Sequence, residues 1–189
     1  MRRFGWVWNR RRDFYRLRSR ARLYGQYVLH RRTPTTSLLT IGTARVGSTL
    51  LNSYLNSLPN VSMRGEVLNP HSPQGLPYDS GHRGVALRHL RVNLRSQASS
   101  VGGLKILLGS FKRHGLTIGD LQSVAPDLRF LIIYRRSLAD QFVSREIARR
   151  TGSFVLTERG TPRRVSVHVD REEFRRYCKR TRKLYRQLL

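Results

Sequence analysis

The stretch from Leu38 to Leu51, LLTIGTARVGSTLL, decides the fold of this chain. An apolar run ends at Ile41, a loop of small residues carries one basic side chain, Arg45, and a second apolar run begins at Leu50. This order predicts a strand, a loop and a helix, an arrangement that points backbone N–H groups at a phosphate. The stretch therefore predicts a phosphate-binding loop within an α/β domain.

The loop differs from the one that binds ATP. Gly42 and Gly47 keep the glycine spacing of a Walker A loop, GxxxxGK[ST], but Ser48 occupies the position of its phosphate-contacting lysine. The cation of this stretch, Arg45, lies inside the loop instead. The pattern therefore indicates a phosphate loop that is not the loop of an ATPase.

The composition fits one globular domain with a large positive charge. With 189 residues, the chain is long enough for one domain with a core and short for two. The net charge is +26, and of the 37 Lys and Arg residues only four are Lys. Such a field attracts polyanions, among them nucleic acid, anionic membranes, acidic glycans and nucleotides. A genome rich in G and C, which favours arginine codons, is an alternative cause, so the charge alone selects no partner.

The sequence carries no pattern of an exported or membrane-spanning protein. A single cysteine, Cys178, cannot form a disulfide within the chain. No run reaches the roughly 18 apolar residues of a membrane span, and the basic N-terminus lacks the apolar core of a secretory signal. The default expectation is a soluble cytoplasmic protein.

Residues 1–33 form a basic, aromatic leader ahead of a domain that spans 34–189. Apolar residues of the leader recur at the spacing of one helix face: Phe14, Leu17, Ala21, Tyr24 and Val28. One interpretation is a surface for anionic lipid or a polyanionic substrate, which would make the protein peripheral to a membrane. The alternative is a helix that docks this stripe on the domain and leaves its arginines solvated.

Strands and helices alternate in the predicted domain. Beyond the first strand and loop, strands are expected at 103–108 and 128–134, and helices at 48–58, 117–124, 138–150 and from about 171 onward. The run 128–134, LRFLIIY, is nearly continuous in strand formers, as expected at the middle of a parallel sheet. The helix at 48–58 is expected to pack through one apolar face, formed by Leu50, Leu51, Tyr54, Leu55 and Leu58. Residues 69–100 are expected to form either a long loop that recognises an acceptor or a disordered insert.

This alternation predicts a three-layer α/β/α domain with a mostly parallel sheet. Ligands of such sheets bind at the carboxyl ends of the strands. The Arg45 loop and the pair Arg135-Arg136 both follow predicted strands, so we expect them to line one site. Guanidinium groups bind phosphate bidentately, and two separated basic positions imply a ligand with two anionic groups.

A nucleotide kinase is a weaker alternative for this site. ATP with magnesium normally needs a loop lysine and an acidic metal ligand. Ser48 stands where the lysine is needed, and the best predicted strand ends in Tyr134-Arg135 rather than in an acid.

Two motifs resemble those of sulfotransferases. Residues 44–51, ARVGSTLL, resemble the 5′-phosphosulfate loop in the R-x-G-S-T-L-L form of bacterial and Golgi carbohydrate sulfotransferases. Residues 135–144, RRSLADQFVS, resemble the 3′-phosphate motif of the same superfamily, where a strand-end Arg precedes a Ser by eight residues, as Arg136 precedes Ser144. The run ARRTG that follows is most similar to the bacterial trehalose 2-sulfotransferase type. The resemblance covers roughly residues 37–155.

The resemblance implies a P-loop-like fold and an enzyme that moves a sulfonate group from 3′-phosphoadenosine-5′-phosphosulfate to a hydroxyl of a carbohydrate or glycolipid, with no metal. It implies that the 5′-phosphosulfate is held by the loop and the helix start: Arg45, Val46, Gly47, Ser48, Thr49 and Leu50. It implies that Arg136 and Ser144 hold the 3′-phosphate. Arg45 and the helix N-terminus would then stabilise negative charge on the leaving 5′-phosphate oxygen.

The resemblance also points to catalytic residues beyond Arg45. In the family a Glu shortly after the first helix acts as the general base, and Glu66 is the acid in the matching region. An ion pair with neighbouring arginines is the alternative role of Glu66, and His71 is the alternative base. Lys105, inside a predicted strand, either reaches the sulfonate or is a strand-end lysine whose stem packs on apolar surface.

The chain departs from the family at its end. Members usually continue past the C-terminal helix with elements that complete the acceptor site and the adenine pocket, whereas this chain ends at Leu189. A C-terminally truncated or inactive member is therefore an alternative, as is a non-catalytic binder of polyanions or nucleotides with a relic fold. Nucleic acid is a less favoured partner, and the sequence leaves the acceptor and the oligomeric state open.

Overall fold

The computed structural model describes residues 34–72, 74–76, 82–154, 165–186 and 188 of the chain. The leader, residues 1–33, lies outside the described residues, so its helix and its contact with anionic surfaces stay predictions. Within the described residues, no helix combines the length and the apolar composition that crossing a membrane requires.

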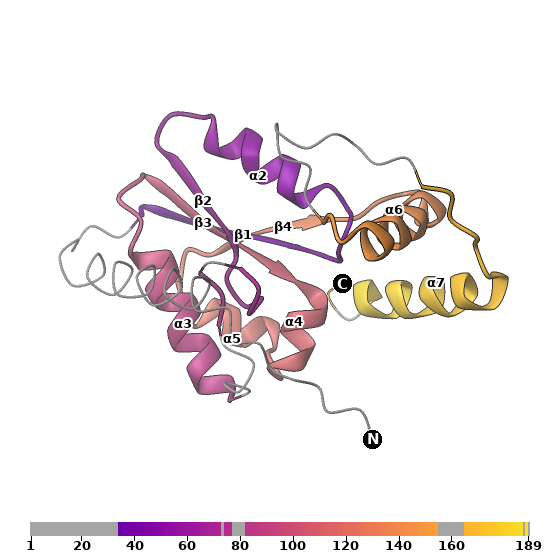
Figure 1. Cartoon of the computed structure of the whole chain (residues 1–189). Helices are drawn as coiled ribbons and strands as arrows, with labels where there is room; N and C mark the ends of the chain where they lie inside the picture. Colours follow the sequence, from indigo (N-terminus) through magenta and orange to yellow (C-terminus); the bar gives the residue numbers. More distant parts are fainter. Residues whose placement is uncertain (1–33, 73, 77–81, 155–164, 187, 189) are drawn as a thin grey trace, which may run out of the picture.

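Four strands form one parallel sheet in the order β2-β3-β1-β4 (Figure 1). The elements along the chain are β1 (Thr36–Gly42), α2 (Ser48–Asn56), β2 (Val61–Glu66), α3 (Arg83–Arg95), β3 (Val101–Leu107), α4 (Leu108–Arg113), α5 (Ile118–Gln122), β4 (Arg129–Ile133), α6 (Leu138–Thr151) and α7 (Arg171–Arg186). The strand β1 pairs in parallel with β3 and β4, and β2 pairs in parallel with β3. The predicted α/β fold with a parallel sheet is confirmed.

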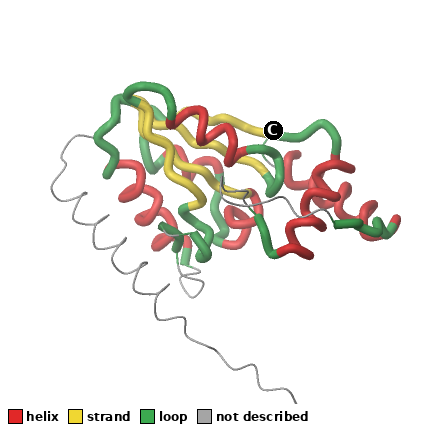
Figure 2. The backbone as a smooth tube through the Cα atoms, turned by 45° about the horizontal axis from the view of Figure 1, so that its top comes forward, coloured by secondary structure: helices red, strands yellow, loops and turns green. Residues whose placement is uncertain are grey.

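Helices lie on both sides of the sheet (Figures 1 and 2). The chain moves outward from β1 to β2 through α2, and it returns across the sheet through α3 and then through α4 and α5. Because parallel connections are right-handed, these opposite directions place α2 on one face of the sheet and α3, α4 and α5 on the other. The carboxyl ends of the four strands therefore meet at one edge, beside the start of α2 and the start of α6.

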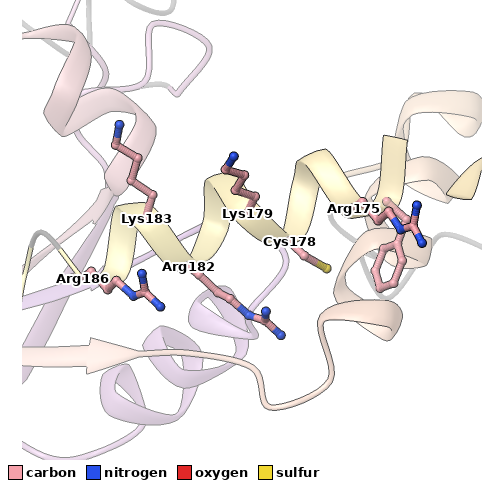
Figure 3. Close-up of a pocket in the computed structure, with 7 residues that line it drawn as sticks. Arg175, Cys178, Lys179, Arg182, Lys183 and Arg186 are labelled. Atoms are coloured by element: carbon pink, nitrogen blue, oxygen red, sulfur yellow. The ribbon is translucent and has the colours of Figure 1, made fainter. Parts of the chain in front are cut away.

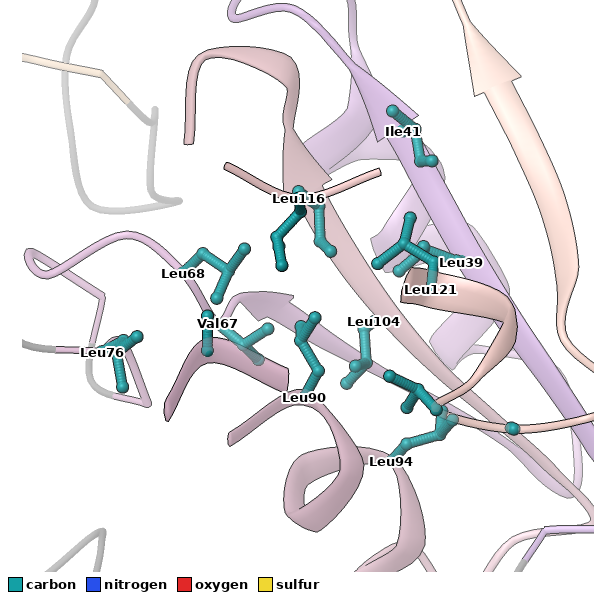
Figure 4. Close-up of a cluster of buried hydrophobic side chains, with 14 of the residues drawn as sticks. Leu39, Ile41, Val67, Leu68, Leu76, Leu90, Leu94, Leu104, Leu116 and Leu121 are labelled. Atoms are coloured by element: carbon teal, nitrogen blue, oxygen red, sulfur yellow. The ribbon is translucent and has the colours of Figure 1, made fainter. Parts of the chain in front are cut away.

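The face that carries α3, α4 and α5 holds the apolar core. Strand alternation places four buried residues of β1 and β3 on this face: Leu39, Ile41, Leu104 and Ile106. Leucines of the neighbouring helices complete the cluster, among them Leu90, Leu94 and Leu121 (Figure 4). Burial of a leucine side chain contributes roughly 1.5–3 kcal/mol, so this face stabilises most of the fold.

Helix α6 begins and ends, and α7 begins, close to where the sequence predicts. The Ser137 hydroxyl accepts the Asp140 N–H at 3.2 Å before α6, and Gly152, with a φ of 68°, ends that helix. Asp170 caps α7 in the same way and accepts the N–H of Glu173 at 2.7 Å. Side-chain caps at the N-terminus and a left-handed glycine at the C-terminus are local signals, so they can be read from the sequence.

The strand predicted at the middle of the sheet, 128–134, lies at its edge instead. Among the described strands, β4 pairs with β1 alone. Its apolar residues are partly exposed, and Ile132 is 36% exposed. The prediction was wrong because an apolar run indicates that helices cover a strand, whereas the number of its neighbours depends on pairing with distant segments.

The apolar face predicted for the helix at 48–58 does not pack on the sheet. Three of its members are 61%, 65% and 51% exposed: Leu50, Tyr54 and Leu58. The buried residues of α2 are Ser48 and Asn52. The Asn56 side chain donates to the Met63 carbonyl at 3.0 Å and accepts the Met63 N–H at 2.6 Å. The prediction of one packed apolar face was wrong for these three residues, because the hydrogen bonds to β2 set the rotation of the helix. Leu51 and Leu55 of the same predicted face are half-buried.

Residues 69–100, predicted as a loop or an insert, contain the 13-residue helix α3. Three of its buried apolar residues recur every four positions, at Ala86, Leu90 and Leu94. His89 and Asn93 lie on the same buried face, with their side chains hydrogen-bonded at 3.1 Å. Because these polar residues interrupt the apolar stripe, the apolar periodicity of the sequence did not predict this helix. The short helix α4 was also not predicted, because it follows β3 without an intervening turn signal.

Candidate functional site

The loop between β1 and α2, residues 43–47, lies at the carboxyl edge of the sheet (Figure 1). Gly47, with a φ of 92°, caps α2, and its carbonyl accepts the N–H of Leu51 at 3.0 Å. No side chain caps the N-terminus of α2, so the N–H groups of its first turn face the loop with the positive end of the helix dipole. The predicted strand, loop and helix are confirmed, and their backbone suits an anion.

Arg45 adopts an uncommon backbone conformation in this loop. Its φ is 68°, in the left-handed region, which costs a residue other than glycine on the order of 1 kcal/mol. The Nε of Arg45 donates to Ser144 Oγ of α6 at 3.0 Å, and its Nη1 donates to the carbonyl of Phe154. The structure thus brings together Arg45 and Ser144, which the resemblance assigns to opposite ends of the donor.

Lys105 of β3 lies beneath the start of α2 and joins two other candidate residues. Its side chain is buried, its Nζ donates to Thr49 Oγ1 at 3.0 Å, and the same Nζ lies 2.8 Å from Glu66 Oε1. Glu66 pairs with Lys105 across the strands, next to a β-bulge in β2. Sheet register therefore brings Thr49, Glu66 and Lys105 into one cluster, although 17 and 39 residues separate them along the chain.

The Glu66 carboxylate is held on one side and open on the other. Its Oε2 accepts the Asn69 Nδ2–H at 2.6 Å, while its side chain is 23% exposed. Within the part of the chain that the structure describes, the ion partner of Glu66 is Lys105 and not a neighbouring arginine. A fixed but accessible carboxylate is suited to accept a proton from a bound molecule. His71, the alternative base, lies in the adjacent turn, where its backbone N–H donates to Asn69 Oδ1 at 3.0 Å.

Arg64, a half-buried cation two residues before Glu66, ties β2 to α3. Its guanidinium donates to Asn93 Oδ1 at 3.2 Å and to the Ser96 carbonyl at 3.1 Å. Burial lowers the pKa of Arg64 to about 10, so the guanidinium keeps its charge at neutral pH. Both of these hydrogen bonds connect it to α3, which gives Arg64 a structural role.

Two residues that the sequence analysis missed hold the start of the loop. Gln141, fully buried in α6, donates from Nε2 to Thr43 Oγ1 at 2.7 Å and to the Ala44 carbonyl at 2.6 Å. The Tyr185 hydroxyl of α7 accepts the Thr43 N–H at 3.1 Å and donates to the Ile133 carbonyl at 2.6 Å. Gln141 lies within the 135–144 motif at a position to which the resemblance assigns no role, and Tyr185 lies outside both motifs. Only the packing of α6 and α7 against the strand ends brings them to the loop.

Arg136 lies apart from Ser144, in a groove between the end of β4 and α7. The groove has a volume of about 940 Å³. Arginines from two segments line it: Arg135 and Arg136 from the loop between β4 and α6, and Arg182 and Arg186 from α7. Its apolar lining is formed by Ile132, Tyr134, Leu138 and Phe174. The groove and the loop meet at Tyr185, whose side chain lines the groove and whose hydroxyl contacts Thr43.

The structure therefore places the predicted site residues in two neighbouring groups at the carboxyl edge. One group joins Arg45 to Ser144 and Thr49 to Lys105 and Glu66, and the other holds Arg136 in the groove. Comparison of the chain with protein-family models, with curated proteins and with solved structures finds no match.

Proposed function

We propose that the protein is a sulfotransferase with a three-layer, P-loop-like fold. In this proposal it moves a sulfonate group from 3′-phosphoadenosine-5′-phosphosulfate to a hydroxyl of a carbohydrate or glycolipid, without a metal. The observation that carries the proposal is the cluster of Thr49, Lys105 and Glu66, because it sets a cation and an accessible carboxylate beside an anion-binding helix N-terminus.

Each residue has a defined role in the proposed reaction. Gly47, Ser48 and the first turn of α2 bind the 5′-phosphosulfate with Arg45, and Arg136 binds the 3′-phosphate in the groove. Glu66 accepts the proton of the acceptor hydroxyl as its oxygen forms a bond to sulfur. The bond between sulfur and the 5′-phosphate oxygen breaks, and Lys105 stabilises the charge that develops on that oxygen.

The hydrogen bond between Arg45 and Ser144 is compatible with this scheme. It holds the guanidinium against α6 at the mouth of the loop, where an anion on the α2 N-terminus is within reach of a short side-chain movement. A charge-assisted bond from Arg45 to a phosphosulfate is stronger than its bond to a neutral serine hydroxyl. Donor binding is therefore expected to redirect Arg45 and to release Ser144 for the donor.

A nucleotide kinase is the second candidate, and the position of Lys105 favours it. Although Ser48 replaces the loop lysine, Lys105 reaches Thr49 from the neighbouring strand, and Glu66 supplies an acid at the end of β2. The two candidate functions require different nucleotides: a kinase binds one with a γ-phosphate and magnesium, and a sulfotransferase binds one with a 3′-phosphate.

Calorimetry with 3′-phosphoadenosine-5′-phosphate, the product of the donor, separates the candidates. We expect micromolar binding that is lost in Arg136→Ala, is weakened about tenfold in Arg45→Ala and is unchanged in Arg88→Ala, an exposed α3 arginine that serves as the matched control. Tighter binding of ATP with magnesium than of the 3′-phosphorylated nucleotide would overturn the proposal in favour of a kinase.

Glu66→Gln tests the general base. We expect this variant to keep its affinity for the nucleotide within about threefold and to lose turnover of the radiolabelled donor, because the amide cannot accept the proton. If Glu66→Gln is as active as the parent, Glu66 is not the general base, and His71 becomes the candidate for that role.

A further inference from the structure

Past its first turn, the exposed surface of α7 is entirely basic. The acidic residues of the helix occur at its start, as Glu172 and Glu173, and every exposed residue from 174 to 186 is Lys or Arg. Five of these basic residues form what we call the cationic face: Arg175, Lys179, Arg182, Lys183 and Arg186 (Figure 3). The side chains of Lys179 and Lys183 extend to one side of the helix, and those of Arg182 and Arg186 extend to the other.

The charges of the cationic face oppose the stability of its own helix. Like charges four residues apart repel, as at Lys179 and Lys183 and at Arg182 and Arg186. Lys183 and Arg186 gain from the helix dipole in the last turn, but Lys179 lies too far from the C-terminus to do so. Among the described residues, Arg175 alone of the five forms an ion pair, with Glu172 at 2.7 Å. A bound polyanion would relieve this repulsion.

The cationic face continues into the groove at the candidate site. Arg182 and Arg186 belong to both, and Arg136 lies across the groove from them. Tyr185, on the same turn, contacts the phosphate loop. From Arg175 to Arg186 the helix rises about 16 Å, so a chain that lies along α7 ends at the loop.

We propose that the cationic face of α7 binds the acceptor, and that this acceptor is a linear acidic polysaccharide with sulfate or carboxylate groups. The inference rests on the proposed function and names the substrate class of the same site. Guanidinium and ammonium groups bind such anions, and consecutive turns of a helix repeat them along one direction. The anionic groups of the chain would lie on the five cations while a hydroxyl near its end reaches Glu66.

Two other polyanions fit the cationic face less well. Single-stranded nucleic acid is held by stacking of successive bases on aromatic side chains, whereas one aromatic residue, the half-buried Phe174, lines the cationic face, and the exposed Tyr134 lies across the groove. A lipid surface binds helices that combine cations with a broad exposed apolar face, whereas Phe174 and Cys178, both half-buried, are the uncharged residues that line this one. A ligand recognised through its charge alone, with hydroxyls to modify, agrees best with this surface.

The test is the affinity of the full chain for a fluorescent chondroitin sulfate hexasaccharide, with neutral maltohexaose as the comparison ligand. Lys179→Glu/Lys183→Glu reverses two charges of the cationic face that do not line the groove. Arg88→Glu/Arg95→Glu makes the same charge change at two exposed positions of α3. We expect the α7 variant to lose at least tenfold in affinity for the sulfated hexasaccharide and the α3 variant to stay within twofold.

The outcomes separate this inference from the proposed function. Equal losses in both variants would overturn the inference, because the net charge and not α7 would then attract the glycan. A DNA duplex or vesicles of phosphatidylglycerol that bind more tightly than the hexasaccharide at the same salt concentration, and lose tenfold in the α7 variant, would overturn the choice of partner. Binding of 3′-phosphoadenosine-5′-phosphate with no effect of the α7 variant on the glycan would overturn the inference alone. Glycan binding that depends on α7, without any nucleotide binding, would overturn the proposed function and keep the cationic face as a glycan site.

Discussion

The two faces of the sheet are built from the same strands but differ in chemistry. Leu39 and Leu104 pair on the face covered by α3, α4 and α5, where they enter the apolar core (Figure 4). The next residue pair along, Thr40 and Lys105, points to the face covered by α2, where both side chains are buried. A period of two residues thus sends leucine to one side of the sheet and a buried lysine to the other.

The apolar core that stabilises the fold and the candidate site residues therefore lie on opposite faces of the sheet. The apolar face excludes water and holds no candidate site residue. The α2 face is held largely by hydrogen bonds, from Asn56 to β2 and from Lys105 to Thr49 and Glu66. Buried polar groups are costly unless paired, and on this face they are paired with one another.

The largest effect is expected on the apolar face. Leu104→Ala should lower the free energy of unfolding by about 2–5 kcal/mol, because it removes buried methyl groups and leaves a cavity in the core. Urea denaturation measures this loss, and calorimetry on the folded variant should show unchanged nucleotide affinity. A loss below about 1 kcal/mol would mean that the core lies elsewhere.

A smaller loss of stability, with a clear loss of function, is expected for Lys105→Met. The free energy of unfolding should fall by about 1–3 kcal/mol, because Glu66 loses its cation but keeps Asn69 and partial contact with water. Nucleotide affinity should fall at least tenfold. In Lys105→Met/Glu66→Leu, stability should return while turnover stays absent, since apolar residues can replace a buried ion pair. Recovery of turnover in the double variant would contradict the division between the faces.

Tyr185→Phe tests the contact between α7 and the loop. The change leaves the Thr43 N–H and the Ile133 carbonyl without the hydroxyl, so unfolding should become easier by about 1–2 kcal/mol. Nucleotide affinity should fall about threefold. Tyr54→Phe, at an exposed tyrosine of α2, is the control and should change neither quantity. Equal behaviour of the two variants would exclude a role for Tyr185 in holding the loop.

The acid dependence of stability tests the helix cap on the apolar face. The hydrogen bond from Arg83 lowers the pKa of Asp120, which also accepts from Thr117 at the start of α5. A carboxyl with a lowered folded-state pKa stabilises above its unfolded pKa, near 3.9, and this stabilisation is lost as the pH falls through the folded value.

Asp120→Asn should therefore lower stability at pH 7 by less than about 1 kcal/mol, because Arg83 is largely exposed. Thermal unfolding between pH 5 and pH 2 should show a flatter acid response in Asp120→Asn than in the parent. An identical acid response of the two proteins would remove Asp120 from the groups that titrate on unfolding.

The smallest effect is expected on the outer surface of α2. Tyr54→Ser should change the free energy of unfolding by no more than about 0.5 kcal/mol, because the side chain is 65% exposed. The apolar pattern of the sequence predicts a loss several times larger. A loss above about 2 kcal/mol would show that something covers this surface in solution.

Much of the fold follows from local patterns in the sequence. The run ending at Ile41 and the small-residue loop predicted β1 and the start of α2. Ser137 and Gly152 lie at the two ends of α6, and Asp170 lies at the start of α7. Helix α3 escaped prediction because His89 and Asn93 occupy its buried face and pair with each other. Such pairing is invisible in a hydropathy pattern, which counts each polar residue as exposed.

The sequence by itself determined the strand, loop and helix around Arg45 and the parallel α/β class, and it singled out the candidate residues Arg45, Glu66 and Lys105. Those features depend on residue types at short spacing. The tertiary structure alone decided that β4 is an edge strand, that Leu50 and Tyr54 of α2 are exposed and that Lys105 joins Thr49 to Glu66. These depend on strand order, register and helix rotation, which are set by contacts between segments far apart in the chain.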